Sequence, residues 1–107
     1  MQRYGSVLKV KPGKLALYKK LHAAVWPAVL QMIKKCHIHN YSIYHKDGWL
    51  FSYFEYNGKD FKADMARMAA DPLTQKWWAV CTPCLQPLKT RAKGEYWAGM
   101  EEVFHQA

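Results

Sequence analysis

The chain has 107 residues, half of them hydrophobic, so it can form one domain with its own core and is too apolar to be disordered. No apolar run approaches the roughly 20 residues that span a bilayer, and the N-terminus lacks the hydrophobic centre of a signal peptide. The net charge of +8 comes without a recognition-helix, RNA-binding or zinc-finger signature. We expect a single domain over residues 1–107 that binds no nucleic acid and no membrane.

The cysteines point to a reducing compartment. There are three, an odd number, and Cys81 and Cys84 stand too close together for a good disulfide framework. Their Cys-x-Pro-Cys pattern also occurs in thioredoxin-like redox pairs and in half of a zinc site. A redox pair follows a strand and opens a helix, whereas this pair follows a helical pattern, and a zinc site would need Cys36, His37 or His39 as well. We therefore expect incidental cysteines, no metal and a cytoplasmic location.

The first third of the chain predicts a strand and then a long helix. Residues 4–10 are rich in β-formers and end at the turn residues Pro12 and Gly13. From residue 14 to about residue 35, apolar side chains recur with the helical period: Leu17, Leu21, Val25, Val29, and Met32 or Ile33. Pro27 lies inside this pattern, and proline removes a backbone donor and clashes with the preceding turn. The helix is expected to bend or split there.

The middle of the chain predicts a β-hairpin. Residues 38–45 and 49–56 have strand character, and Lys46-Asp47-Gly48 between them is typical of a hairpin turn. Asn57-Gly58 ends the second of these strands.

The last third predicts two helical pieces and a strand. Residues 60–70 form the first piece and residues 73–80 the second, with Asp71 as N-cap and Pro72 at the first helical position. A basic loop follows over residues 86–94, and residues 95–104 contain the last strand.

The order β-α-β-β-α-β is the ferredoxin-like arrangement, an α+β fold with its helices on one face of an antiparallel sheet. Both faces of the strand at residues 49–56 are nonpolar. One face carries Leu50, Ser52 and Phe54, and the other carries Phe51 and Tyr53. A second copy of the sheet is the simplest cover for the face without helices. We therefore expect a symmetric homodimer.

Tyr18 and His22 stand four residues apart in the first helix, so the phenol and the imidazole point the same way. Together they form an acid/base and hydrogen-bonding pair for a small polar ligand. Tyr41 and the pair Trp77-Trp78 add further polar groups and aromatic faces. This combination is typical of a carbohydrate site, although each of these residues could also serve only to pack the core.

Six segments form a longer pattern in constant order: Arg3-Tyr4, Tyr18-x-x-x-His22, Val25-Trp26-Pro27, His39-Asn40-Tyr41-Ser42-Ile43-Tyr44, Trp77-Trp78 and Glu101-Glu102-Val103-Phe104-His105. Over nearly the whole chain this pattern resembles the L-rhamnose mutarotase family. The resemblance implies a ferredoxin-like fold, dimerisation through the sheets, and interconversion of the α and β anomers of L-rhamnose without a metal or organic cofactor.

The resemblance also implies residue roles. His22 matches the family's proton donor, and the sugar-contacting positions match Tyr18, Tyr41, Trp77 and Trp78. Asn40 and Trp26 are expected to line the pocket because they lie close to these motifs.

The chemistry suits these residue types. Anomerisation opens a cyclic hemiacetal, rotates the aldehyde carbon and closes the ring again on the other face. Protons must leave and return at the anomeric hydroxyl and at the ring oxygen, and histidine exchanges protons near neutral pH. Indoles can stack on the C–H face of a pyranose or contact the 6-methyl group of a deoxy sugar.

The chain departs from the family pattern at two places. His37 stands where the family usually has glycine, so a positive φ there would strain the backbone. Residues 81–94 also follow the family poorly, and this loop is expected to shape the pocket rim. The substrate could therefore be another deoxy sugar or an ordinary aldose.

Two other functions remain open on the sequence alone. One is a ferredoxin-like dimeric monooxygenase that oxidises haem or quinones, with His22 as iron ligand or base. The other is a non-catalytic module whose tryptophans and tyrosines hold a sugar or an RNA base.

Overall fold

A computed structural model describes all 107 residues. The elements follow in this order: β1 (Gln2–Val10), α1 (Leu15–His22), α2 (Pro27–Lys35), β2 (Ile38–Lys46), β3 (Trp49–Tyr56), α3 (Phe61–Ala70), α4 (Pro72–Cys81), the 3₁₀ turn η1 (Thr82–Cys84), β4 (Leu85–Gln86) and β5 (Ala98–Met100). Every strand and helix expected from the sequence is present. The two-residue strand β4 was not expected.

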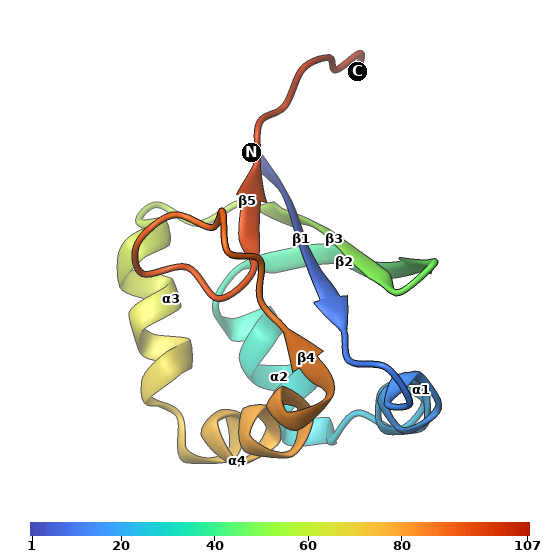
Figure 1. Cartoon of the computed structure of the whole chain (residues 1–107). Coiled ribbons are helices and arrows are strands. Elements are labelled where there is room, and N and C mark those ends of the chain that lie inside the picture. Colours follow the sequence, from blue (N-terminus) through green and yellow to red (C-terminus); the bar gives the residue numbers. More distant parts are fainter.

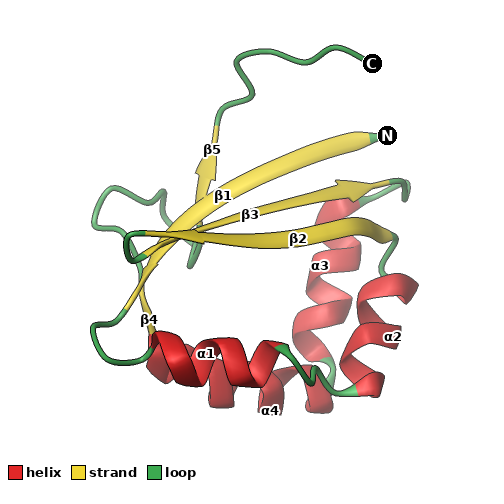
Figure 2. Cartoon of the chain, turned by 90° about the vertical axis from the view of Figure 1, so that its right-hand side faces the viewer, coloured by secondary structure: helices red, strands yellow, loops and turns green.

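The strands form one antiparallel sheet in the order β2-β3-β1-β4, and β5 also pairs with β1. Figure 1 shows β5 running beside β1, although they lie at opposite ends of the chain. All four helices lie on one face of the sheet (Figure 2). The ferredoxin-like α+β prediction is therefore confirmed. We call the face that carries the helices the inner face and the opposite face the outer face.

Pro27 divides the first helical pattern into two helices, as predicted. α1 ends at His22, and α2 begins at Pro27 after an extended Trp26 (φ −60°, ψ 133°). Proline is well placed at a first helical position, where its missing N–H group would have no partner in any case. The split matters for the site because it leaves His22 on the last turn of α1.

Aspartates begin the two later helices. The side chain of Asp60 accepts a hydrogen bond from the backbone N–H of Ala63 at 3.1 Å. Asp71 accepts from the backbone N–H of Thr74 at 2.9 Å and from its hydroxyl at 2.8 Å. Such caps satisfy donors that the first turn of a helix leaves free. The predicted cap at Asp71 is confirmed.

The core lies between the sheet and the helices. One buried cluster joins strands β1, β3 and β4 of the sheet to α1 and η1: Leu8, Val10, Tyr18, Leu50, Cys84 and Leu85. A second cluster joins α2 to α4: Val29, Trp77 and Cys81. Tyr18 and Trp77, both expected at the site, thus have one side in the core.

His37 has a φ of 65°, in the left-handed region that favours glycine. The condition for backbone strain at this non-glycine position is therefore met, and the conformation costs a β-carbon-bearing residue about 1–2 kcal/mol. The His37 Nδ1 atom lies 3.2 Å from a carboxylate oxygen of Asp64, but the imidazole is exposed, and exposed pairs contribute little.

We expect His37→Gly to raise the free energy of unfolding by about 1 kcal/mol, because the relief of backbone strain exceeds the loss of an exposed contact. Urea unfolding gives the value. His37→Ala is the matched control, because it removes the same imidazole but keeps the strain, and it should be less stable than wild type. A glycine variant no more stable than the alanine variant would show that the backbone here is unstrained.

Candidate active site

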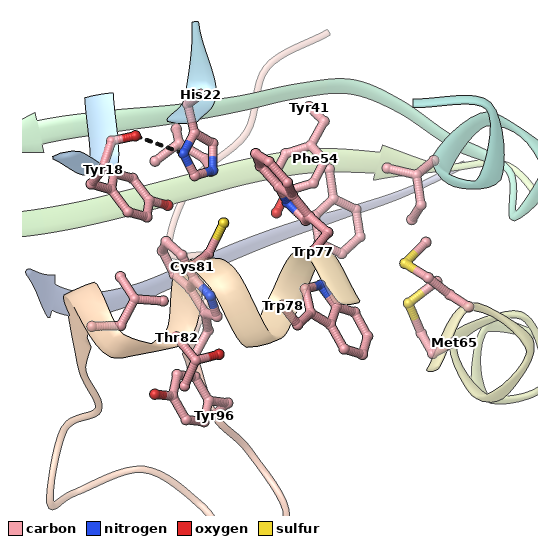
Figure 3. A pocket seen from close by; sticks show the side chains of 15 residues that line it. Tyr18, His22, Tyr41, Phe54, Met65, Trp77, Trp78, Cys81, Thr82 and Tyr96 are labelled. Carbon is pink, nitrogen blue, oxygen red and sulfur yellow. Dashed lines mark hydrogen bonds between the residues drawn. The ribbon is translucent and has the colours of Figure 1, made fainter. Parts of the chain in front are cut away.

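A cavity of about 410 Å³ lies between the inner face of the sheet and the helices. Thirteen of its 15 lining residues are hydrophobic. Five of the residues expected at the site line it together (Figure 3): Tyr18, His22, Tyr41, Trp77 and Trp78. α1, β2 and α4 supply them. A second cavity of about 420 Å³ shares His22, Tyr41, Trp77 and Trp78, so these residues stand between two neighbouring spaces.

His22 has one ring nitrogen engaged and one free. Its Nδ1 atom lies 2.9 Å from the backbone carbonyl oxygen of Tyr18 (Figure 3). A carbonyl can only accept, so Nδ1 carries the proton that is donated. In the neutral imidazole, Nε2 is then unprotonated and can accept a proton. The hydrogen bond therefore selects the tautomer suited to general base catalysis.

Two aromatic rings hold the imidazole in place. The ring of Tyr18 stacks on it with centroids 4.1 Å apart, and Trp77 contacts it edge to face at 5.4 Å. Tyr18 is 5 % exposed and Trp77 is 6 % exposed, so neither ring can move far without opening the core. His22 has little freedom to rotate away from the cavity.

Of the three tyrosines that line the cavity, Tyr18 and Tyr41 have phenols that stay protonated over a wide pH range. Burial raises the pKa of Tyr18 well above its ordinary value, and the nearby Tyr41 raises it further. Loss of water around the hydroxyl also raises the pKa of Tyr41, although 45 % of that residue's surface is exposed. A neutral phenol can donate a hydrogen bond. Both hydroxyls are therefore suited to hold oxygen atoms of a ligand.

The two neighbouring tryptophans differ in burial. Trp77 is buried in the cluster between α2 and α4, whereas Trp78 is 42 % exposed, and both line the cavity. Adjacent helical residues point about 100° apart, which accounts for the difference. Trp77 is both a core residue and a wall of the site.

Trp26 and Asn40 lie outside both cavities. Trp26 packs edge to face on Trp77 with ring centroids 5.3 Å apart, so it supports a wall of the site. Asn40 has a φ of 48° beside a register shift of β2, and its amide donates to Glu55 at 2.7 Å. Trp26 therefore lies beside the site without lining it, and Asn40 is hydrogen-bonded to β3 through Glu55.

All three cysteines are free and buried. Burial raises the pKa of the Cys81 thiol to about 11, and a protonated thiol is a poor nucleophile. No group of three or more histidine, cysteine, aspartate or glutamate side chains could hold a metal ion. Cys36, His37 and His39 therefore do not complete a zinc site with Cys81 and Cys84. Cys81 lines the cavity as an apolar side chain.

Several other lining residues were not predicted individually from the sequence, although Thr82 falls within residues 81–94, which were expected at the rim. Met65 and Met68 come from α3, Thr82 from η1, and Tyr96 and Trp97 from the connection between β4 and β5. Met65 and Met68 are three residues apart on α3, so the helical period could have placed both of them on its inward face. No periodic signal exists for residues in an irregular connection.

The fold and the cavity define a class: a ferredoxin-like α+β protein with an aromatic, mostly apolar site around one histidine. The family model described as L-rhamnose mutarotase matches residues 3–106. The chain belongs to the L-rhamnose mutarotase family. Mutarotation interconverts sugar anomers, so the expected enzyme class, an isomerase, is confirmed by this membership.

Relatives agree with this assignment, and a solved structure has the same fold. The L-rhamnose mutarotase of Oceanobacillus iheyensis is 32 % identical over 98 % of both chains. That of Phocaeicola vulgatus is 38 % identical over 73 % of this chain and 74 % of its own. The crystal structure of an L-rhamnose mutarotase from Formosa agariphila has a TM-score of 0.80 at 23 % identity and full coverage of both chains.

The fold is shared more widely than the family. Tetracenomycin F2 cyclase from Streptomyces glaucescens, a polyketide cyclase, has a TM-score of 0.70 at 13 % identity over 100 % of this chain and 98 % of its own. This similarity concerns the fold alone. No helix of the structure has both the length and the apolar character needed to cross a membrane.

The raised pKa of Tyr18 can be measured by absorbance titration of tyrosinate. Because burial keeps the phenol protonated, subtracting the titration of Tyr18→Phe from that of wild type should leave no transition near pH ~10, the ordinary tyrosine pKa. A difference in that pH range equal to the absorbance change of one ionising tyrosine would show that the Tyr18 phenol is accessible to water.

Proposed function

We propose that this chain interconverts the α and β anomers of L-rhamnose, with His22 as the acid/base group. The observation that carries the proposal is the hydrogen bond from His22 Nδ1 to the Tyr18 carbonyl, which leaves Nε2 free beside an aromatic cavity. Family membership supports the reaction and the sugar. A related aldose is the alternative substrate.

One imidazole can carry out both proton transfers of ring opening. Neutral Nε2 takes the proton of the anomeric hydroxyl while the bond between C1 and the ring oxygen breaks, and the electron pair of that bond goes to the ring oxygen. The imidazolium then returns the proton to that oxygen. Both oxygens are bonded to C1, so a single nitrogen can reach them in turn. Rotation about C1–C2 and the reverse steps close the ring on the other face.

The remaining groups bind and orient the sugar. The neutral phenols of Tyr18 and Tyr41 donate hydrogen bonds to sugar oxygens. Trp77 and Trp78 offer apolar ring faces to the C–H face of the pyranose or to its 6-methyl group. A mostly apolar cavity suits a deoxy sugar, because it offers few partners for an additional hydroxyl.

The outer face of the sheet supports assembly as a homodimer. It carries exposed apolar side chains: Tyr44 is 64 %, Met100 43 % and Phe51 37 % exposed. Tyr44 and Phe51 pair across β2 and β3, and Met100 lies opposite Gly5 of β1. Val103 and Phe104, in the segment that follows β5, are 87 % and 80 % exposed. A second copy of the same face would cover these groups.

Buried, reduced thiols are compatible with the cytoplasmic location that we propose.

We expect His22→Ala to lose at least about 100-fold of the enzymatic anomer exchange, the typical contribution of a general acid/base. Saturation-transfer NMR on equilibrated L-rhamnose measures the exchange rate. His39→Ala is the control, because it removes an imidazole that lies outside both cavities. Equal activity of wild type and His22→Ala would keep the reaction and remove His22 from its role. No acceleration by wild type with rhamnose, fucose or glucose would overturn the proposed function.

We expect wild type to sediment with twice the chain mass of 12.5 kDa and Phe51→Glu to sediment as a single chain. The reason is that a carboxylate buried at a symmetric contact loses its water without gaining a partner. Leu17→Glu, an exposed position on α1, is the control and should stay dimeric. A single-chain mass for wild type would contradict the dimer.

A further inference from the structure

The connection between β4 and β5 supplies an indole to the cavity. Trp97 lines the cavity and packs against the buried cluster that contains Tyr18. Its neighbour Ala98 begins β5 and pairs with Val7 of β1. Trp97 therefore reaches the cavity from the sheet, whereas Trp77 reaches it from α4 in the helix layer. A sugar ring bound between the sheet and the helix layer would contact one indole from each layer.

Glu95 fixes the segment that presents Trp97. Its Oε1 atom accepts hydrogen bonds from the backbone N–H groups of Ala92 at 3.0 Å and Gly99 at 3.2 Å. These two groups lie on either side of Trp97 in the chain, so one carboxylate holds both ends of the segment. Gly99 leaves room for this arrangement, because a β-carbon there would lie 2.8 Å from Glu95 Oε2.

We propose that Trp97 is a sugar-contacting residue of this site, opposite Trp77, and that Glu95 is its positioning residue. The inference rests on the proposed function, because it assumes a sugar between the two layers. Indoles contact the C–H face of a sugar as an apolar surface, and this contact is the same in the bound sugar and in the transition state. Trp97 therefore acts on binding and leaves the proton transfers at His22 unchanged.

The test compares KM, kcat and calorimetric binding of L-rhamnose in wild type and variants. Trp97→Ala should weaken binding and raise KM by about tenfold, as expected for the loss of one large apolar contact, with kcat changed less than about twofold. Trp97→Phe should recover part of the affinity. Trp49→Ala is the matched control, because Trp49 lines neither cavity and lies against Lys9.

The positioning role has its own variants. Glu95→Ala and Gly99→Ala should each raise KM in the same direction as Trp97→Ala, since the first removes the acceptor and the second displaces it. Glu95→Gln keeps an acceptor oxygen and should behave as wild type. Thermal unfolding of each variant shows that it is folded.

The outcomes separate the two proposals. Unchanged affinity and KM in a folded Trp97→Ala, with active wild type, would overturn this inference alone. A loss of kcat with unchanged KM would also overturn it. Binding of L-rhamnose without anomer exchange by wild type would overturn the proposed function alone, because affinity still reports on Trp97. No binding and no exchange by wild type would overturn both.

Discussion

The site depends on the hydrogen bond between Nδ1 of His22 and the backbone carbonyl of Tyr18. The carbonyl is part of the helix, so the orientation of the imidazole is set by α1 itself and by the rings of Tyr18 and Trp77 packed against it. Since a carbonyl cannot donate, the bond also decides which nitrogen stays free. A four-residue spacing in one short helix thus fixes the position, orientation and tautomer of the imidazole that we propose as the acid/base group.

The two faces of the sheet have different tasks. The inner face and the four helices enclose an aromatic cavity that contains one histidine, His22, and burial keeps the phenols of Tyr18 and Tyr41 neutral. Loss of water strengthens the hydrogen bonds that these groups make to a ligand. The outer face has no helices (Figure 2), and its apolar side chains are exposed. The homodimer that we propose forms through the outer face, so it does not cover the cavity on the inner face.

Much of this arrangement could be predicted, because it depends on local patterns. Hydrophobic periods located the helices and strands, Pro27 marked a helix start, and the spacing of Tyr18 and His22 placed them on one face. Local patterns did not predict the position of Asn40. A register shift and a positive φ at that residue break the alternation of side chains, and its amide binds Glu55. Trp97 was missed because its contact with the cavity depends on how β5 pairs with β1, and no local pattern encodes that pairing.

The tautomer of His22 decides whether its Nε2 atom can act as a base. Long-range ¹H–¹⁵N correlation NMR of ¹⁵N-labelled protein, at a pH where imidazoles are neutral, distinguishes a protonated Nδ1 from a protonated Nε2. The signals of His22 are those absent from the spectrum of His22→Ala. We expect Nδ1 to carry the proton and Nε2 to have the chemical shift of an unprotonated nitrogen. A proton on Nε2 would contradict the proposed role of His22, because the nitrogen that faces the sugar could then not act as the base that opens its ring.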